Sequence, residues 1–354
     1  MNEVFLAGRG IACSLGLDLA AATRAVIAPP PAQRIDLGTL GDFPYRVIDE
    51  AGHDDWYARA QRIVTRVVDE AGGLAIRHAP LFVASSSVDV GAHEGHPAGF
   101  IPDCHAFAQR IARMLCWQGP VFTLATACTS SINALLSAAR LLRHGTADDA
   151  LVLGVELANT FTARGFAAMQ LLSRSGAQPF APTRDGLELG EAVAALRLAR
   201  TPSPWRLCGG ANVVNGADAA GTCAEAVIAM TQRALADSGM HASDIDLVKV
   251  QAAGSPASDA IEAGALQTAF GRDVPLCTYK HLIGHTLGAS GAAEIALLTA
   301  GIEAASLPSL HVAADSALHL HVARPTQAAR TVLADILGFG GGHAAVVLSR
   351  AHAS

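Results

Sequence analysis

Cys128 is the residue whose surroundings most favour nucleophilic chemistry. It stands in VFTLATACTSSINALLSAARLLRHG, residues 121–145, which is typical of a strand, a turn of small residues and an amphipathic helix. A helix start offers free N–H groups and a partial positive charge that stabilise a thiolate, and Thr129, Ser130 and Ser131 are the expected capping residues. A sharp strand-to-helix turn also presents a nucleophile outward. The alternative is a small cysteine that only fills a crowded turn.

A second segment, CTYKHLIGHTLGASGAAEIALL at 277–298, places His285 in a glycine-flanked loop before a predicted helix. The glycines permit close backbone approach and put the imidazole on a loop rather than in a core. Lys280 is one of two lysines in the chain, beside 23 arginines, which favours a role for ammonium geometry. Glu294 could pair with Lys280 or with His285. A polar loop that only caps a helix is the alternative interpretation.

Two further segments could supply backbone or carboxyl groups. ILGFGGGHAAVVLS at 336–349 carries the triple glycine 340–342, whose N–H groups could form an oxyanion hole. It precedes a strand instead of opening a helix, which disfavours nucleotide binding. VQAAGSPASDAIEAGAL at 250–266 is typical of a strand, a turn and a helix, with Asp259 expected as N-cap and Glu262 at its third position.

These segments must be held by an α/β framework. Short apolar runs alternate with amphipathic segments, a pattern typical of sheets covered by helices on both faces. Strands are predicted at 3–8, 80–85, 121–126, 150–155, 193–199, 246–252, 274–278 and 344–349. Helices are predicted at 58–71, 105–116, 130–143, 222–238, 259–270 and 289–303.

Composition excludes several classes of protein. Of 354 residues, 51% are hydrophobic and 16% charged, which indicates a large core and excludes a disordered chain. The net charge of −6 without a basic block disfavours nucleic acid. Mean hydropathy is +0.33, yet no uninterrupted apolar stretch would span a membrane, and the opening residues lack a signal-peptide pattern. We therefore expect a cytoplasmic protein.

Seven cysteines without a CxxC pair indicate neither a disulfide framework nor a metal site. The proline-containing segment RTPSPWR at 200–206 is the best internal boundary. It divides the chain into 1–203, with the nucleophile, and 204–354, with the other candidate residues. A strand, a small-residue turn and a long helix occur in each part, at 121–143 and 246–270, which suggests a duplication.

In this order and spacing, the segments resemble the β-ketoacyl-ACP synthase (ketosynthase) family of fatty-acid and polyketide synthesis. The resemblance covers almost the whole chain. It is carried by VFLAGRGIACSLG (4–16), TACTSS (126–131), PFAPTRDGLELGEAVAAL (179–196), KHLIGHTLGASGAAE (280–294) and GFGGGHAAVVL (338–348). It implies the thiolase fold: two duplicated α/β halves in five αβαβα layers, usually in a dimer.

The resemblance also implies roles for individual residues. Cys128 would take the acyl chain from acyl carrier protein, and His285 would assist malonyl decarboxylation and condensation. Lys280 and Glu294 would support His285 through a charge network. Phe339 resembles the gating residue. Its backbone N–H and that of Cys128 would form the oxyanion hole, with Gly340 beside them.

One departure from the family pattern bears directly on function. The family carries a histidine in an HGTGT-like motif eight residues before the aspartate, and here that position is Gln251. The two threonines that contact phosphopantetheine fall at Ala253 and Ser255. A glutamine amide can donate a hydrogen bond but cannot carry a proton. Loss of one positioned acid–base or donor group typically costs ~10²–10⁴-fold in rate.

The hypothesis is therefore a catalytically degenerate ketosynthase subunit that pairs with a complete ketosynthase, similar to the chain-length factors of type II polyketide and aryl polyene systems. The retained Cys128 and His285 argue against it, because many chain-length factors lose the cysteine. The alternatives are a competent synthase with a Cys128–Gln251–His285 site, or an acyltransferase that uses Cys128. Expected partners are acyl carrier protein and a ketosynthase subunit or a second copy. The chemistry requires no metal or other cofactor, since the carrier protein supplies phosphopantetheine.

Overall fold

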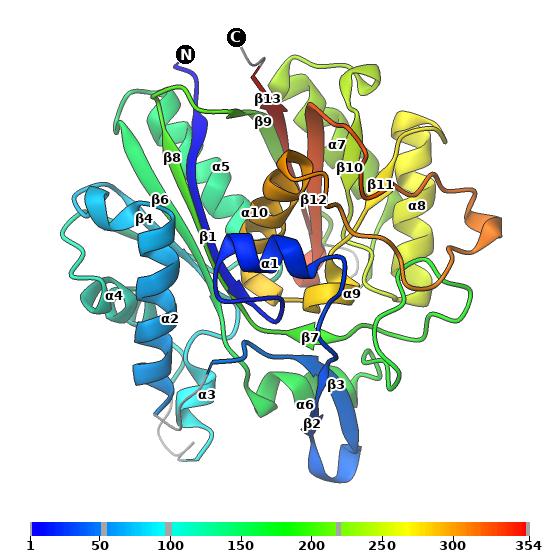
Figure 1. The fold of residues 1–354 in the computed structure, drawn as a ribbon, viewed down its shortest axis with the longest axis horizontal. Coiled ribbons are helices and arrows are strands. Elements are labelled where there is room, and N and C mark those ends of the chain that lie inside the picture. The colour runs from blue at the N-terminus through cyan, green and yellow to red at the C-terminus, as the bar shows by residue number, and fades with distance from the viewer. Residues whose placement is uncertain (1, 51–54, 96–100, 217–220, 352–354) are drawn as a thin grey trace.

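The computed structural model describes residues 2–50, 55–95, 101–216 and 221–351. Its main feature is a ten-stranded sheet with the order β11-β10-β12-β13-β9-β1-β8-β6-β4-β5 (Figure 1). The strands of this sheet are β1 (Phe5–Cys13), β4 (Leu81–Ala84), β5 (Val121–Leu124), β6 (Asp149–Glu156), β8 (Ala192–Ala199), β9 (Trp205–Val214), β10 (Leu247–Lys249), β11 (Leu276–Cys277), β12 (Thr331–Gly338) and β13 (Gly342–Arg350).

The sheet consists of two equivalent halves. Starting from one edge of the sheet, β5, β4 and β6 run parallel to one another. The next strand, β8, is antiparallel to β6, and β1 is antiparallel to β8. The other half repeats this pattern, with β11-β10-β12 parallel and then β13 and β9 antiparallel. Within the sheet, the two halves are joined where Phe5 and Leu6 of β1 pair with β9. This repetition is the duplicated thiolase fold.

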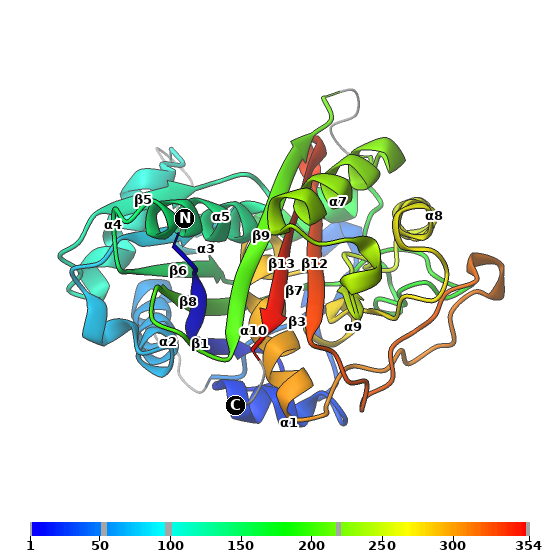
Figure 2. The same cartoon turned by 90° about the horizontal axis from the view of Figure 1, so that it is seen from above.

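Helices complete five layers. α5 (Ser130–Arg143) and α10 (Ser290–Glu303) contact strands of both halves and form the middle layer. α2 (Trp56–Glu70) and α4 (Cys104–Met114) cover the outer face of the first half, and α7 (Ala224–Ser238) and α8 (Pro256–Phe270) lie against the second (Figure 2). The middle helices are almost entirely buried, so a functional group at the start of either lies deep in the protein.

A second, small sheet and α6 lie together at one end of the molecule (Figure 1). A three-stranded sheet has the order β2-β3-β7, and α6 packs on the same apolar cluster, near the loop that carries Phe339. The bounds are α1 (Leu19–Ala25), β2 (Gln33–Asp36), β3 (Asp42–Arg46), α3 (Val90–His93), α6 (Thr160–Ala168), β7 (Leu189–Gly190) and α9 (Lys280–Ile283). Single turns of 3₁₀ helix occur at Gly38–Leu40, Gly73–Ile76, Ala242–Asp244, Leu287–Ala289, Ser316–Leu318 and Phe339–Gly341.

The predicted helices and strands all occur, with shifted ends. Sequence reasoning missed β9 and β12 of the large sheet, and it also missed α1, α3, α6, α9 and the three-stranded sheet. Residues 205 and 206, predicted as part of a boundary segment, begin β9, and the division after residue 203 lies in the turn before it. β9 contains Gly209, where a Cβ atom would lie 2.4 Å from the backbone nitrogen of Ser238 in α7. A glycine is present at this position because α7 packs closely against β9, although glycine does not favour a strand. β12 was not predicted because Asp335, a buried acid, interrupts its run of apolar residues.

Candidate active site

Cys128 lies in the turn between β5 and α5, as predicted, and is 4% exposed. Ala127 before it has a φ of 50°, an uncommon conformation for a residue with a side chain, so the turn is tight. The predicted capping is wrong in detail. Thr129 is the N-cap residue without a side-chain capping bond, and its hydroxyl donates to the Thr126 carbonyl. Ser130 Oγ donates to the Ala127 carbonyl, so these hydroxyls stabilise the turn.

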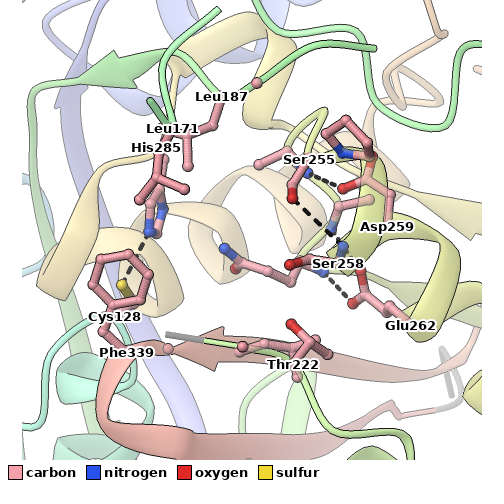
Figure 3. A pocket seen from close by; sticks show the side chains of 18 of the residues that line it. Cys128, Leu171, Leu187, Thr222, Ser255, Ser258, Asp259, Glu262, His285 and Phe339 are labelled. Atoms are coloured by element: carbon pink, nitrogen blue, oxygen red, sulfur yellow. Dashed lines mark hydrogen bonds between the residues drawn. The ribbon is translucent and has the colours of Figure 1, made fainter. Parts of the chain in front are cut away.

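His285 approaches Cys128 from the other half of the chain. Its Nε2 lies 3.0 Å from Cys128 Sγ (Figure 3). The His285 backbone is fixed by β7, because its N–H donates to the Glu188 carbonyl and its carbonyl accepts from the Gly190 N–H. A Cβ atom on Gly190 would lie 2.0 Å from the Ile283 carbonyl oxygen, so only glycine permits this close approach.

A buried ammonium fixes the state of the imidazole. Lys280 Nζ lies 3.1 Å from His285 Nδ1 and 3.0 Å from Ser290 Oγ, and it contacts Glu294 Oε1 at very short range. An ammonium can only donate, so Nδ1 accepts and the ring proton is on Nε2. Burial, then the Lys280 charge, hold the His285 pKa well below its usual range. His285 is therefore a neutral ring whose Nε2–H points at Sγ.

The thiol itself is kept protonated. Burial raises the pKa of Cys128 above its ordinary value, although the Phe339 backbone N–H and the Lys280 charge oppose this. The groups that lower the pKa are thus the Phe339 and Cys128 backbone N–H groups and the Lys280 charge, and the desolvation of the thiolate outweighs them. The Phe339 N–H faces the sulfur, and with the Cys128 N–H it provides donors where an oxyanion would form.

A cavity of about 120 Å³ opens beside the sulfur. Figure 3 shows Cys128 and His285 at one end and the Ser255–Glu262 segment at the other. Phe339 also lines the cavity, and its ring stacks on Phe166 with centroids 5.3 Å apart. Gly340 has a φ of 80° and lines a neighbouring cavity of about 370 Å³ that also reaches Phe339. The Phe339 ring therefore contributes to the walls of two cavities.

The cavity beside the Cys128 sulfur is also lined by Gln251, Ala253 and Ser255, as their positions in the sequence led us to expect. Gln251 Oε1 is buried and has no hydrogen-bond partner among the residues that the structure describes. The prediction that Asp259 caps α8 is wrong: Ser255 is the N-cap and accepts from the Ser258 N–H. Asp259 is held by the N–H groups of Phe180, Ala253 and Gly254 instead.

Three ionisable residues close to the site were not predicted as members of it. Lys249 Nζ lies 2.9 Å from Glu294 Oε2, and Asp335 lies beside it on β12. Glu262 accepts from the N–H groups of Gln251 and Ala252, which ends β10 at residue 249 and shapes the cavity wall. The rarity of lysine in this chain was a signal that could have identified Lys249.

Among the described residues, no cluster of three or more His, Cys, Asp or Glu side chains could hold a metal ion. Across the same described ranges, no helix is long and apolar enough to cross a membrane.

Two family models match the chain. "Beta-ketoacyl synthase, N-terminal domain" matches residues 84–203 and "Beta-ketoacyl synthase, C-terminal domain" matches 209–313. The chain is 28% identical over 262 residues to 3-oxoacyl-[acyl-carrier-protein] synthase 2 of Coxiella burnetii, which covers 66% of this chain and 62% of that protein. It is 36% identical over 224 residues to erythronolide synthase EryA2 of Saccharopolyspora erythraea, covering 57% of this chain and 6% of that protein. The matched segments thus span less than two thirds of either relative.

Solved structures share the fold. The ketosynthase ApeO in complex with its chain length factor ApeC, from Xenorhabdus doucetiae, superposes with a TM-score of 0.87 at 23% identity, covering 99% of this chain and 98% of that one. A ketosynthase from module 6 of the bacillaene synthase of Bacillus subtilis 168 gives 0.86 at 18% identity, with 99% and 72% covered.

Proposed function

The chain belongs to the β-ketoacyl synthase family, and from that premise we propose that it is a subunit of an acyl-chain elongation system that accepts an acyl group on Cys128 but depends on a complete ketosynthase for condensation. The substrate is an acyl thioester carried on the phosphopantetheine arm of acyl carrier protein. No resident cofactor is needed for this transfer. The system belongs to fatty-acid or polyketide synthesis.

The acylation step uses the groups around Cys128. The sulfur attacks the thioester carbonyl, and the oxyanion accepts hydrogen bonds from the backbone N–H groups of Cys128 and Phe339. The carbonyl–sulfur bond to pantetheine then breaks, and the departing pantetheine thiol takes the proton that Cys128 gives up. His285 Nε2–H stabilises the developing thiolate at 3.0 Å.

The proposed dependence on a partner for condensation rests on the presence of Gln251 in the cavity. Condensation requires loss of CO₂ from malonyl thioester and stabilisation of the enolate oxygen before it attacks the acyl-Cys128 thioester. Gln251 lines the cavity and can offer this oxygen only a neutral amide N–H. With one of the two expected imidazoles absent, we expect condensation to be slower by ~10²–10⁴-fold.

The sheet edge supports association with another subunit. β5 is the last strand of the first half, and its outer backbone groups have no strand partner in the described chain. Phe122 on this strand is 41% exposed, although its ring stacks on Phe82. Ile101, before α4, is 81% exposed, and α4 is tied to β5 through His105 and Thr123. An open edge with exposed apolar side chains is typical of a strand that pairs with a second chain.

A second candidate is a competent synthase with a Cys128–Gln251–His285 site. The contact between His285 and Cys128 favours it, because a subunit that only supports its partner does not need this geometry. An acyltransferase that passes the chain to an alcohol or amine would use the same cysteine.

Co-expression with a ketosynthase from the same genome tests the partner proposal. We expect the two chains to co-purify, and the complex but not the isolated protein to form 3-ketoacyl product from acyl- and malonyl-carrier protein. A stable homodimer that ignores the ketosynthase, or product formed at the same rate without it, would overturn the proposal. The Phe122→Glu variant, altered at the sheet edge and remote from the cavity, should lose co-purification while remaining folded.

A further inference from the structure

Both lysines of the chain bind the same buried carboxylate. Glu294 Oε1 contacts Lys280 Nζ, and Glu294 Oε2 lies 2.9 Å from Lys249 Nζ. All three side chains are 0% exposed. Lys280 faces His285, whereas Lys249 comes from β10 and reaches Glu294 through its other oxygen. One carboxylate therefore stands between two buried ammonium groups.

The buried positive charge of Lys249 must be compensated by negative charge nearby, and neighbouring carboxyl groups supply it. Lys249 Nζ also donates to the Asp335 carbonyl. The Asp335 carboxyl is fully buried beside Glu262, whose pKa is raised well above its usual range by burial and by the Asp335 charge. Because its pKa is raised furthest, Glu262 is the carboxyl that keeps its proton, and the negative charges of Asp335 and Glu294 balance the two ammonium groups. The ionisable groups around Lys249 are Glu294 (α10), Asp335 (β12), Glu262 (α8), Lys280 (α9), His285 and Cys277 (β11).

We propose that Lys249 is a positioning residue for His285: by holding the second oxygen of Glu294, it keeps Lys280 aimed at His285 Nδ1. The effect of Lys249 on catalysis rests on the proposed function. Its effect on the position and tautomer of His285 does not.

The donor geometry gives the reason. The three partners of Lys280 Nζ are Glu294 Oε1, Ser290 Oγ and His285 Nδ1, which is the full capacity of an ammonium group. Without Lys249, Glu294 Oε2 would lack this partner and would compete for another Lys280 N–H. The donor directed at His285 is the weakest of the three, because its acceptor is uncharged and it is the longest contact. Lys280 would then leave Nδ1, and the Ser290 hydroxyl, 3.2 Å from Nδ1, would remain beside it. A hydroxyl can donate or accept, so the ring would no longer be held with its proton on Nε2.

The test uses Lys249→Met, which removes the ammonium and retains an unbranched apolar side chain. Thr231→Val is the matched control, because this buried hydroxyl on α7 has no hydrogen-bond partner within the described part of the chain. The pH profile of Cys128 alkylation by iodoacetamide is measured on each full-length variant. Loss of a buried positive charge disfavours the thiolate, so the profile should move to higher pH, with alkylation at pH 8 about 3- to 10-fold slower than in the wild type. Lys249→Arg should restore the wild-type profile.

Nitrogen-15 NMR of the His285 ring gives the second measurement. The wild type should show a bare Nδ1 and a protonated Nε2, and Lys249→Met a mixture of both neutral tautomers. If Lys249→Met fails to fold, the charge-balanced double variant Lys249→Met with Asp335→Asn takes its place. A variant that is less stable but keeps both the pH profile and the tautomer would show a structural role and overturn the inference. Alkylation needs no acyl carrier, so this outcome is independent of whether the protein elongates chains.

Discussion

Glu294→Gln provides a quantitative test of the buried network. The substitution keeps the shape of the side chain but removes the negative charge between Lys249 and Lys280, all of them 0% exposed. Breaking a buried ion pair by neutralising one partner typically costs ~3–5 kcal/mol. An unfolding entropy of about 2.1 cal/mol/K per residue gives about 0.7 kcal/mol/K for this chain, so the expected fall in Tm is about 4–7 °C.

Glu303→Gln on the same helix is the matched control. Glu303 pairs with Arg9, and both side chains are partly exposed. Its Oε1 also accepts from the buried Trp205 indole N–H, a bond that the glutamine oxygen can keep. The loss of its charge should therefore cost no more than about 1 kcal/mol, or about 1 °C. The assay is urea unfolding at neutral pH, followed by circular dichroism and supported by calorimetric Tm values. If Glu294→Gln and Glu303→Gln destabilise the protein equally, the two lysines are not charged in the folded state and the argument for the His285 tautomer fails.

Three further predictions concern the neighbouring groups. Gly190→Ala places a Cβ atom 2.0 Å from the Ile283 carbonyl, so it should displace His285 and lower the stability by more than about 2 kcal/mol, as measured by urea unfolding. Burial raises the pKa of Asp335 from 3.8 to about 6, so the folded state binds this proton more tightly than the unfolded chain. Lowering the pH from 7 to 5 should therefore stabilise the wild type relative to Asp335→Asn, and an unchanged difference in unfolding free energy would contradict this. Because burial raises the pKa of Cys128 above 9.0, its alkylation rate should still be rising above pH 9. A plateau at neutral pH would show that the thiolate is already formed.

Local patterns were sufficient to predict the elements that hold the site. The helix predicted at 130–143 matches α5, because its apolar residues recur at helical spacing and small polar residues precede it. The pairing of Lys280 with Glu294 could be stated as one of two options, since a spacing of 14 residues does not fix which groups meet. The structure adds that the carboxylate contacts Lys280 and not the imidazole.

What the sequence could not predict depends on contacts between distant segments. Lys249 and Asp335 lie 86 positions apart, and only the parallel pairing of β10 with β12 brings them together. The direction of the Cys128 pKa shift likewise could not be predicted from the strand-turn-helix pattern, because the burial that raises the pKa comes from the whole fold. Ser255 caps α8 in place of Asp259, because three backbone N–H groups, one of them from Phe180, converge on the aspartate.

The intact mass of the isolated protein, before and after a chase with malonyl-carrier protein, tests the central claim most directly. Incubation with acyl-carrier protein should give an acyl adduct in the wild type and none in Cys128→Ala. The adduct should persist after the chase, and no 3-ketoacyl-carrier protein should form, whereas Gln251→His should consume the adduct and release that product. Rapid loss of the wild-type adduct with appearance of the elongated product would show a competent synthase and contradict the account. So would a folded wild-type protein that forms no adduct at all.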